Sequence, residues 1–330
     1  MTDLDQANSG RISLANADCE RRHGWRAFSP GQGGFRAMMP AVAPQMWAKN
    51  AMSPELTVLS EMLRAAAARE IIPRFQHVAA QAKADGSLVT QADLGVQAII
   101  RAELAQAFPG VPLLGEEMPA EEQRALLASA EGGIWCLDPL DGTSNYAGGF
   151  PYFCISLALL HGGQTRLGLV LDPVRDECFA AERGSGAWLN GMPLAPPFAG
   201  TDLGDCLAIV DLKRLPASLL ARLGAGAPYR SLRSLGSVAL EWCWLAAGRA
   251  RLYLHGGQRL WDYAAGRLIA REAGVHSQLQ EPGGQPVTDE LSLSPRLAMA
   301  AANPCLLAHW IAWLELGEGP RPDLQEGKGR

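Results

Sequence analysis

Several features are missing from this sequence. None of its seven cysteines stands in a Cys-x-x-Cys pair, the spacing typical of zinc sites and thiol redox motifs. No stretch approaches the roughly 20 apolar residues of a membrane span, and the polar start MTDLDQANSG lacks the apolar core of a signal peptide. No run of Lys and Arg offers the basic face that nucleic acids require. We therefore expect a cytoplasmic protein with reduced, mostly buried thiols and no nucleic-acid or membrane partner.

The composition itself is that of a folded chain. Hydrophobic residues make up 48% of the 330 residues and charged residues 19%, with a net charge of -5. This balance predicts a substantial core in one large domain or two closely packed ones. An acidic protein can still bind phosphates where cations neutralise them locally.

The ordered part is predicted to begin near residue 52. Residues 1–51 mix Gly, Pro, Ser and Arg without periodicity and are predicted to be a disordered leader, with Met52 as the natural start. Ser53 can cap a helix whose first turn holds Pro54. The polar tail, 317–330, is also predicted to be disordered.

Residues 52–195 are predicted to form an amino-terminal α+β domain. The apolar spacing predicts helices that carry Leu56, Leu59, Leu63 and Ala67, and, from Thr90, Val96, Ile99, Ile100 and Leu104. The segment KADGSLV between them is predicted to be a turn. The run 134–138 is predicted to be a buried strand that Pro139 ends, and 153–160, 166–172 and 177–182 continue an antiparallel sheet.

Residues 196–316 are predicted to form a carboxy-terminal α/β domain. It follows Asn190-Gly191, a strong turn signal, and strand-like and helix-like runs alternate in it. The predicted strands are 206–211, 250–254 and 296–302, and the predicted helices are 216–223, 236–248, 261–272 and 304–316.

Two aspartates, Asp138 and Asp141, follow the buried strand within DPLDG. A turn there can aim both carboxylates at one point, and Mg²⁺ prefers such oxygen ligands. The carbonyl of Leu140 lies between them. Capping of the turn by the two acids is the alternative.

Three further acidic positions have equally plain structural alternatives. Glu116 in GEE could be a solvated edge. Asp93 lies three residues past Thr90 and could complete a helix cap. Asp262 in WDYAAG stands at a helix start, where an acid normally caps.

The joint occurrence of these motifs is more specific than any one of them. The chain carries GSLVTQAD, GEE, DPLDGTSNY and WDYAAGRLIAREAG in this order, and over residues 52–316 it resembles the inositol monophosphatase family of lithium-sensitive phosphatases. The resemblance implies an α/β fold, the alternating αβαβα sandwich of the inositol monophosphatase and fructose-1,6-bisphosphatase type. It also implies a Mg²⁺-dependent phosphoric monoester hydrolase, commonly a homodimer.

The resemblance implies two or three Mg²⁺ ions per site. Glu116, Asp138 and the Leu140 carbonyl would hold the first ion, and Asp138, Asp141 and Asp262 the second. A third, weaker ion would lie near Glu116.

The same resemblance assigns the chemistry. Thr143, with Glu116 and Asp93 behind it, would orient the water that attacks the phosphorus. The backbone amides of Gly142 and Thr143, at the start of a predicted helix, would receive the phosphate.

The substrate is less well defined. RSLGSVALEW aligns with a family segment that places Gly236 and Ser237 at the substrate, although both could serve packing. His255 stands where animal inositol phosphatases carry a glutamate, and it could contact substrate or simply end a strand. Lys83 is left outside the site, because a solvated lysine in a turn explains it equally well.

We expect a small phosphorylated metabolite, with inositol monophosphate first. Histidinol phosphate, a 3′(2′),5′-bisphosphate nucleotide and fructose 1,6-bisphosphate are the alternatives. A phosphatase-fold protein that serves as a regulatory binding partner is the competing class.

Overall fold

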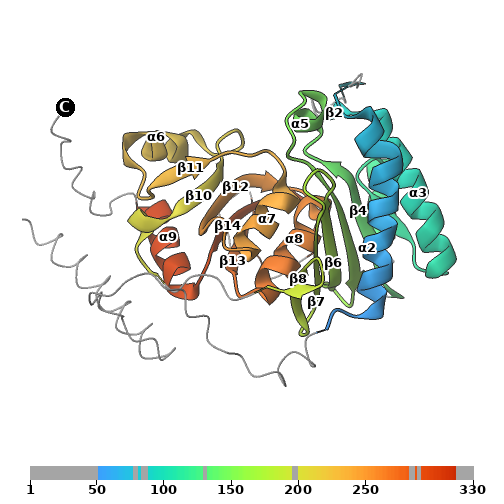
Figure 1. Ribbon diagram of the computed structural model, residues 1–330. Helices are drawn as coiled ribbons and strands as arrows, with labels where there is room; N and C mark the ends of the chain where they lie inside the picture. The colour runs from blue at the N-terminus through green and yellow to red at the C-terminus, as the bar shows by residue number, and fades with distance from the viewer. Residues whose placement is uncertain are drawn as a thin grey trace, which may run out of the picture. The chain divides into compact units, whose positions relative to one another are not determined.

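The computed structural model describes residues 51–76, 81–82, 88–128, 132–194, 200–281, 287 and 291–316. Within them the strands form a seven-stranded, a five-stranded and a two-stranded sheet, and helices cover the two larger sheets (Figure 1). The predicted leader up to residue 50, residues 83–87 of the predicted turn and the tail from residue 317 lie outside the described residues. The described residues belong to one compact unit, and the domain division near residue 195 stays a prediction.

The larger sheet contains the strands predicted between residues 134 and 182. All its neighbouring strands are antiparallel except β3, which pairs with β4 in parallel. Its strands are β3 (Leu113–Gly115), β4 (Ile134–Asp141), β5 (Cys154–His161), β6 (Gln164–Asp172), β7 (Glu177–Glu182), β8 (Gly186–Leu189) and β9 (Met192–Pro193).

Helices α2 (Pro54–Ala66) and α3 (Gln91–Ala107) cover the outer face of this sheet (Figure 1). Both begin as predicted: Ser53 Oγ accepts the Leu56 amide at 3.4 Å, and Thr90 Oγ1 accepts the Ala92 amide at 3.1 Å. Their apolar stripes pack on alternate strand residues. A π-helical turn, η2 (Ala67–Ile71), and a 3₁₀ turn, η3 (Ile72–Arg74), continue α2. Beyond them, β1 (Gln81–Ala82) pairs with β2 (Leu88–Val89), which lies within the segment predicted to be a turn.

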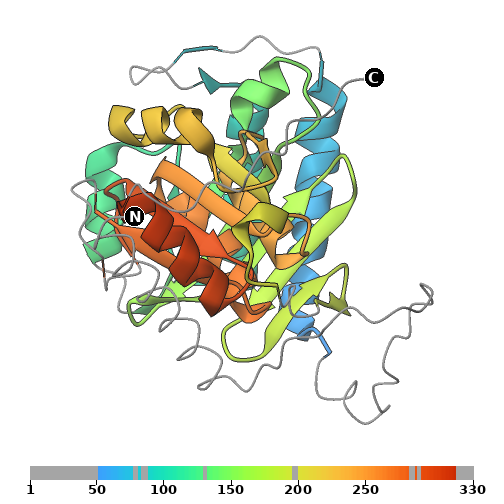
Figure 2. The same ribbon diagram turned by 90° about the vertical axis from the view of Figure 1, so that its left-hand side faces the viewer.

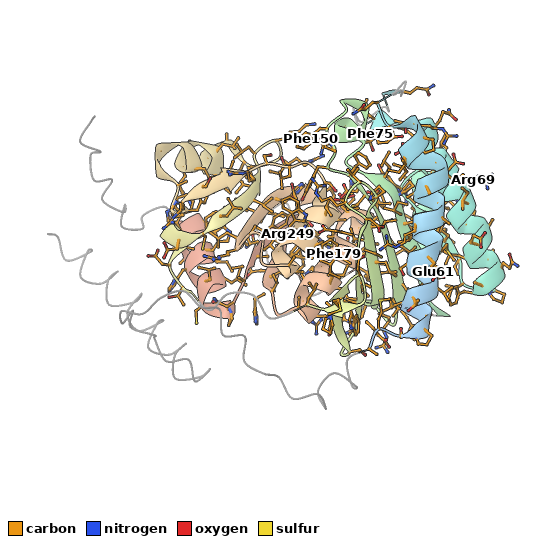
Figure 3. The ribbon with its side chains drawn as sticks, in the orientation of Figure 1. Glu61, Arg69, Phe75, Phe150, Phe179 and Arg249 are labelled. Atoms are coloured by element: carbon orange, nitrogen blue, oxygen red, sulfur yellow. The ribbon has the colours of Figure 1, made fainter. Side chains whose placement is uncertain are left out.

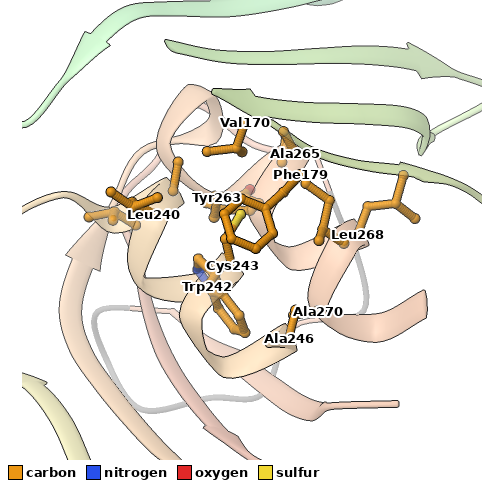
Figure 4. Packing of buried hydrophobic residues seen from close by; sticks show 14 of the residues in the cluster. Val170, Phe179, Leu240, Trp242, Cys243, Ala246, Tyr263, Ala265, Leu268 and Ala270 are labelled. Carbon is orange, nitrogen blue, oxygen red and sulfur yellow. The ribbon is translucent and has the colours of Figure 1, made fainter. Parts of the chain in front are cut away.

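Helices α7 (Val238–Ala246) and α8 (Leu260–Glu272) form the middle layer, between the two larger sheets (Figure 1). Figure 4 shows Phe179 of the larger sheet packed against Cys243 of α7 and Tyr263 of α8. Arg249, which follows α7, extends its guanidinium over the Phe179 ring at 5.8 Å (Figure 3). Large apolar side chains therefore fill this layer, as a close-packed core requires.

The five-stranded sheet has its other face covered by α9 (Pro304–Leu316), which is red in Figure 2, and by α6 (Ala217–Gly226). Ile209 and Tyr253 face the middle layer, whereas their neighbours Val210 and Leu254 face α9, so both sides are apolar. The strand order is β11 (Ser231–Arg233), β10 (Leu207–Asp211), β12 (Leu252–Gln258), β14 (Arg296–Ala301) and β13 (His276–Gln280). The layers thus alternate αβαβα, and the predicted fold class is confirmed.

Three expectations about local structure are wrong. Pro139 does not end β4, which continues to Asp141, because the ladder is irregular there and proline need not donate. Leu88 and Val89, which fall within the predicted turn, form the strand β2. Cys305 is disulfide-bonded, whereas the other cysteines of the described residues are free and buried. The elements not predicted are η2, η3, β1, β2, α4 (Ala120–Ala128), η5 (Leu203–Asp205), β8, β9, β11 and β13.

Candidate metal centre

A bulge in β4 brings Asp138 and Asp141 to the same side of the sheet. Residues three apart on a regular strand point to opposite faces. Here Asp138 lies opposite Ser156 and Asp141 opposite Cys154, so β4 has one more residue than β5 over this stretch. The extra residue reverses the alternation. The Asp138 carboxylate accepts the Leu140 amide at 3.0 Å and so satisfies a donor within the irregular stretch.

Glu116 and Asp262 come to the same place from other elements. Glu116 follows β3, and its amide donates to the Leu137 carbonyl at 3.1 Å, which sets it beside Asp138. Asp262 lies in the first turn of α8, where its Oδ2 accepts the Arg259 amide at 2.8 Å. Ser156, opposite Asp138, donates its hydroxyl to the Trp261 carbonyl at 3.0 Å and ties the start of α8 to β5.

The four carboxylates act on one another electrostatically. Burial raises the pKa of Asp138 well above its usual range, and the charges of Glu116, Asp141 and Asp262 raise it further. Burial and the charges of Asp141 and Glu116 likewise raise the pKa of Asp262. Burial raises the pKa of Asp141 to about 6, although bonds from Ser237 and Ala239 oppose the shift. Such a cluster favours a bound cation.

The donor set suits Mg²⁺. Among the residues that the structure describes, no group of three or more His, Cys, Asp or Glu side chains lies close enough together to hold a metal ion by itself. Mg²⁺ can be held by one or two carboxylates, because it takes its other ligands from water and phosphate. Buried, mutually repelling carboxylates of this kind fit an ion that neutralises them.

Thr143 and Asp93 adjoin the carboxylates. Thr143 Oγ1 lies 2.9 Å from the Leu140 carbonyl and 3.4 Å from Asp93 Oδ1. Asp93 is fully buried, and its other oxygen accepts from the Thr90 amide at 2.8 Å and from the Thr90 hydroxyl at 2.5 Å. Asp93 therefore caps α3 and also reaches Thr143. Burial raises its pKa to about 6.

Gly142 makes the turn between β4 and the short helix α5 (Thr143–Ala147). Its φ is +91°, and a Cβ there would lie 3.0 Å from the Tyr152 carbonyl oxygen. Only glycine meets both conditions without strain.

Ser237, predicted at the substrate, is fully buried and binds a carboxylate instead. Its hydroxyl donates to Asp141 Oδ2 at 2.8 Å, and the Ala239 amide donates to the same oxygen at 2.7 Å. The start of α7 therefore fixes the orientation of Asp141. Gly236, just before it, is exposed with a φ of +82°. Contact of either residue with substrate stays a prediction.

His255 has partners within the protein. It is only 2% exposed, its Nδ1 accepts the Gly257 amide at 3.2 Å, and its Nε2 lies 3.0 Å from Asp211 Oδ2. This geometry gives no support to a direct substrate contact. Its partner, Asp211, is not among the predicted site residues, although it is the acid that ends the predicted strand CLAIVD.

Within the described residues no helix is both long and apolar enough to cross a membrane.

Known proteins resemble this chain along most of its length. The model of the inositol monophosphatase family matches residues 52–311. Inositol monophosphatase 1 of Solanum lycopersicum is 36% identical over 255 residues, which cover 74% of this chain and 87% of that protein. Nus factor SuhB of Xylella fastidiosa is 35% identical over 202 residues, 60% of this chain and 70% of that protein.

A solved structure agrees with the fold. It is an IMPase/NADP phosphatase in complex with Mg²⁺ and phosphate, which superposes with a TM-score of 0.66 at 22% identity and covers 82% of this chain and 100% of that one. With the matched family model and relatives of about 35% identity, this chain belongs to the inositol monophosphatase family.

Proposed function

We propose that the chain is a Mg²⁺-dependent phosphomonoesterase that hydrolyses a small phosphorylated metabolite. The arrangement of four acids supports this proposal: the bulge sets Asp138 and Asp141 on one side of β4, the amide of Glu116 binds the Leu137 carbonyl beside Asp138, and the charge of Asp262 acts on Asp138. The family member solved with Mg²⁺ and phosphate supports it. The dimer expected from the family stays a prediction.

Hydrolysis of a phosphate monoester needs charge neutralisation and a well-placed water. Mg²⁺, when bound, supplies the neutralisation and makes the water more acidic. Thr143 gives its hydroxyl hydrogen to the Leu140 carbonyl or to Asp93, so its oxygen is free to accept a hydrogen bond from the attacking water. With a pKa of about 6, Asp93 is a carboxylate at neutral pH and can take up a proton through Thr143.

An Asp141→Asn variant tests the proposal. The amide keeps an oxygen that can accept from Ser237 and Ala239, so we expect the melting temperature to change little. It lacks the negative charge of a carboxylate ligand. We expect turnover at saturating Mg²⁺ to fall below about a tenth of wild type, because even the loss of a group that only supports a metal ligand costs about 10–100-fold. Phosphate release with Mg²⁺ and with EDTA measures this.

Asp176→Asn is the matched control. Its side chain is 80% exposed, its φ of 54° suits asparagine, and it lies outside the carboxylate cluster. The proposal is supported if Asp176→Asn keeps full turnover while Asp141→Asn loses it. Retention of more than a tenth of the wild-type kcat by Asp141→Asn contradicts it.

The first substrate to test is inositol 1-phosphate, because the tomato relative is named for that activity. Histidinol phosphate, adenosine 3′,5′-bisphosphate and fructose 1,6-bisphosphate complete the panel. Addition of Li⁺ to each reaction tests the lithium sensitivity that the resemblance implies.

A binding role is the second candidate, and similarity to Nus factor SuhB favours it. Wild type and Asp141→Asn serve as paired baits in a pull-down. Retention of the same protein by both baits supports a role that does not depend on metal, since only the wild type has the full carboxylate set. Retention by neither bait contradicts it.

A further inference from the structure

The carboxyl ends of β10 and β12 lie at a switch point of the five-stranded sheet. The two strands are parallel neighbours, with Asp211 opposite His255. The helix that follows β10, α6, packs on the outer face of the sheet, whereas the helix that follows β12, α8, packs on the inner face. Ligands of open α/β sheets bind outside the carboxyl ends of the strands at such a point.

A polar network fills this position. Asp211 Oδ2 accepts from Arg214 Nη1 at 2.9 Å and lies 3.0 Å from His255 Nε2, while Asp211 Oδ1 accepts the Lys213 amide at 2.9 Å. Because His255 Nδ1 accepts the Gly257 amide, Nε2 carries the proton and donates it to Asp211. The buried histidine thus fixes the aspartate, and the aspartate fixes Arg214.

Two glycines let Arg214 lie against β12. A Cβ on Gly256 would overlap the Arg214 carbonyl oxygen, and a Cβ on Gly257 would lie 3.5 Å from Arg214 Cδ. The backbone of β12 is therefore shaped to receive this residue. Its position is set from two sides, by the glycines and by Asp211.

The guanidinium remains available to a ligand. The Arg214 side chain is 51% exposed, and Asp211 engages one of its five N–H donors. Arg214 lies near the candidate metal centre, because Gly256 and Gly257, which it packs against, lead directly into the first turn of α8, where Asp262 accepts the Arg259 amide. Arg214 is therefore an anchored, half-exposed cation at the edge of the proposed phosphatase site.

We infer that Arg214 recognises a second anionic group on the substrate, a phosphate or a carboxylate, beside the phosphate that is hydrolysed. A guanidinium binds such groups through charge-assisted, often bidentate hydrogen bonds that match its planar fork, whereas a sugar hydroxyl offers neither a negative charge nor a second acceptor oxygen. This inference rests on the proposed function. Within the panel it ranks the two bisphosphates above inositol 1-phosphate.

An ion pair that only stabilises the fold is the alternative. A pair with a half-exposed arginine, such as Arg214–Asp211, contributes little to stability, because water screens its charges. Stability alone therefore gives little reason for an arginine fixed by a buried histidine. An ion pair with only a stabilising role would also have no effect on substrate choice.

The test compares matched substrates that differ in one anionic group. Fructose 1,6-bisphosphate against fructose 1-phosphate adds a phosphate, and 2-phosphoglycerate against glycerol 2-phosphate adds a carboxylate. We expect a higher kcat/KM for the doubly anionic member of at least one pair. The preference is the kcat/KM of the doubly anionic substrate divided by that of its singly anionic partner. Arg214→Gln should lower this ratio about tenfold, mainly by raising the KM of the doubly anionic substrate, as for the loss of a hydrogen bond to a charged group. The pair that responds identifies the second group.

Arg230→Gln is the control, because Arg230 is 70% exposed and pairs with Asp205 away from this network. We expect it to leave the ratio unchanged. Wild-type turnover without preference in either pair, or a preference that Arg214→Gln leaves intact in a folded variant, overturns the inference alone. No Mg²⁺-dependent turnover of any substrate overturns the proposed function and the inference together.

Discussion

Glu241 shows how one buried residue holds a loop beside the metal centre. Its side chain is 1% exposed, and Oε1 accepts the amides of Leu235 at 3.3 Å and Gly236 at 3.0 Å. Asn145 holds the same loop through the Leu235 carbonyl at 2.7 Å. The loop ends at Ser237, which orients Asp141. Glu241 therefore helps to position a proposed metal ligand, through the loop and Ser237.

The titration of Glu241 should make stability depend on pH. Burial raises its pKa from 4.5 to about 8. A raised pKa in the folded state means that its contribution to stability is complete below the unfolded pKa and is lost as pH rises through the folded pKa. Glu241→Gln resembles the protonated form, so its stability relative to wild type should increase between pH 4.5 and about 8.

Thermal unfolding in EDTA measures this difference, with both proteins at several pH values in that window. We expect the melting temperature of Glu241→Gln to gain at least about 2 °C on wild type across the window, the shift that roughly 1 kcal/mol gives in a protein of this size. A constant difference between the two proteins would mean that Glu241 does not titrate there.

At the scale of elements, α8 is packed unusually close to its neighbours. A Cβ on Gly266 would lie 2.8 Å from the Ala239 carbonyl oxygen and 2.8 Å from Trp242 Cβ. On the other side, a Cβ on Gly168 of β6 would lie 2.9 Å from the Ala265 carbonyl oxygen. Glycines on both contact surfaces thus let α8 approach α7 and the larger sheet.

Helix propensity and packing make opposite predictions for Gly266→Ala. Alanine favours a helix by about 0.8–1.0 kcal/mol, but the added methyl must displace backbone of α7, and such overpacking costs about 1–3 kcal/mol. We expect net destabilisation, seen as a lower urea midpoint. Gly224→Ala in α6 is the control, because nothing lies within 4 Å of its Cβ position, and we expect it to stabilise. Stabilisation by both substitutions would show that α8 has room to move.

The elements that could be predicted from the sequence are the buried ones. Strands β5, β6 and β7 and helices α7 and α9 carry long apolar runs, so their burial was visible. The missed strands β11 and β13 are the edges of the five-stranded sheet. They are short, and β13 is the polar run HSQLQ, which lacks the alternation of a half-buried strand.

The acidic residues of the candidate site could be predicted from the sequence, but the contacts that hold them in place could not. DPLDG and WDYAAG identified Asp138, Asp141 and Asp262 as a group, although each has a capping role as an alternative. The bulge that sets Asp138 and Asp141 on one side depends on pairing with β5, which no local pattern in β4 reveals. The Asp211–His255 pair depends in the same way on the register of two parallel strands.

At the scale of the whole molecule, the proposed metal couples parts of the chain that lie far apart in sequence. Asp138 and Asp141 belong to the larger sheet and Glu116 directly follows its strand β3, whereas Asp262 belongs to α8 in the middle layer. An ion that binds only the folded arrangement stabilises it by about 2.7 kcal/mol at one hundred times its Kd. We therefore expect Mg²⁺ to raise the melting temperature.

Thermal unfolding with increasing Mg²⁺, at constant ionic strength, tests this coupling without a substrate. The shift should follow a saturation curve in wild type and be strongly reduced in Asp141→Asn. Equal shifts in both proteins would place the stabilising ion elsewhere.

The position of Asp262 also bears on how the protein is made. Residues 93 to 141 leave the ribosome well before α8, the helix that contacts strands β4 to β8 and carries the fourth carboxylate. Until residues 260–272 emerge, the nascent chain has neither its full set of acids nor the helix that covers the inner face of the larger sheet. The chain therefore becomes able to bind the proposed ion only late in its synthesis. A chain truncated before α8 would be inactive.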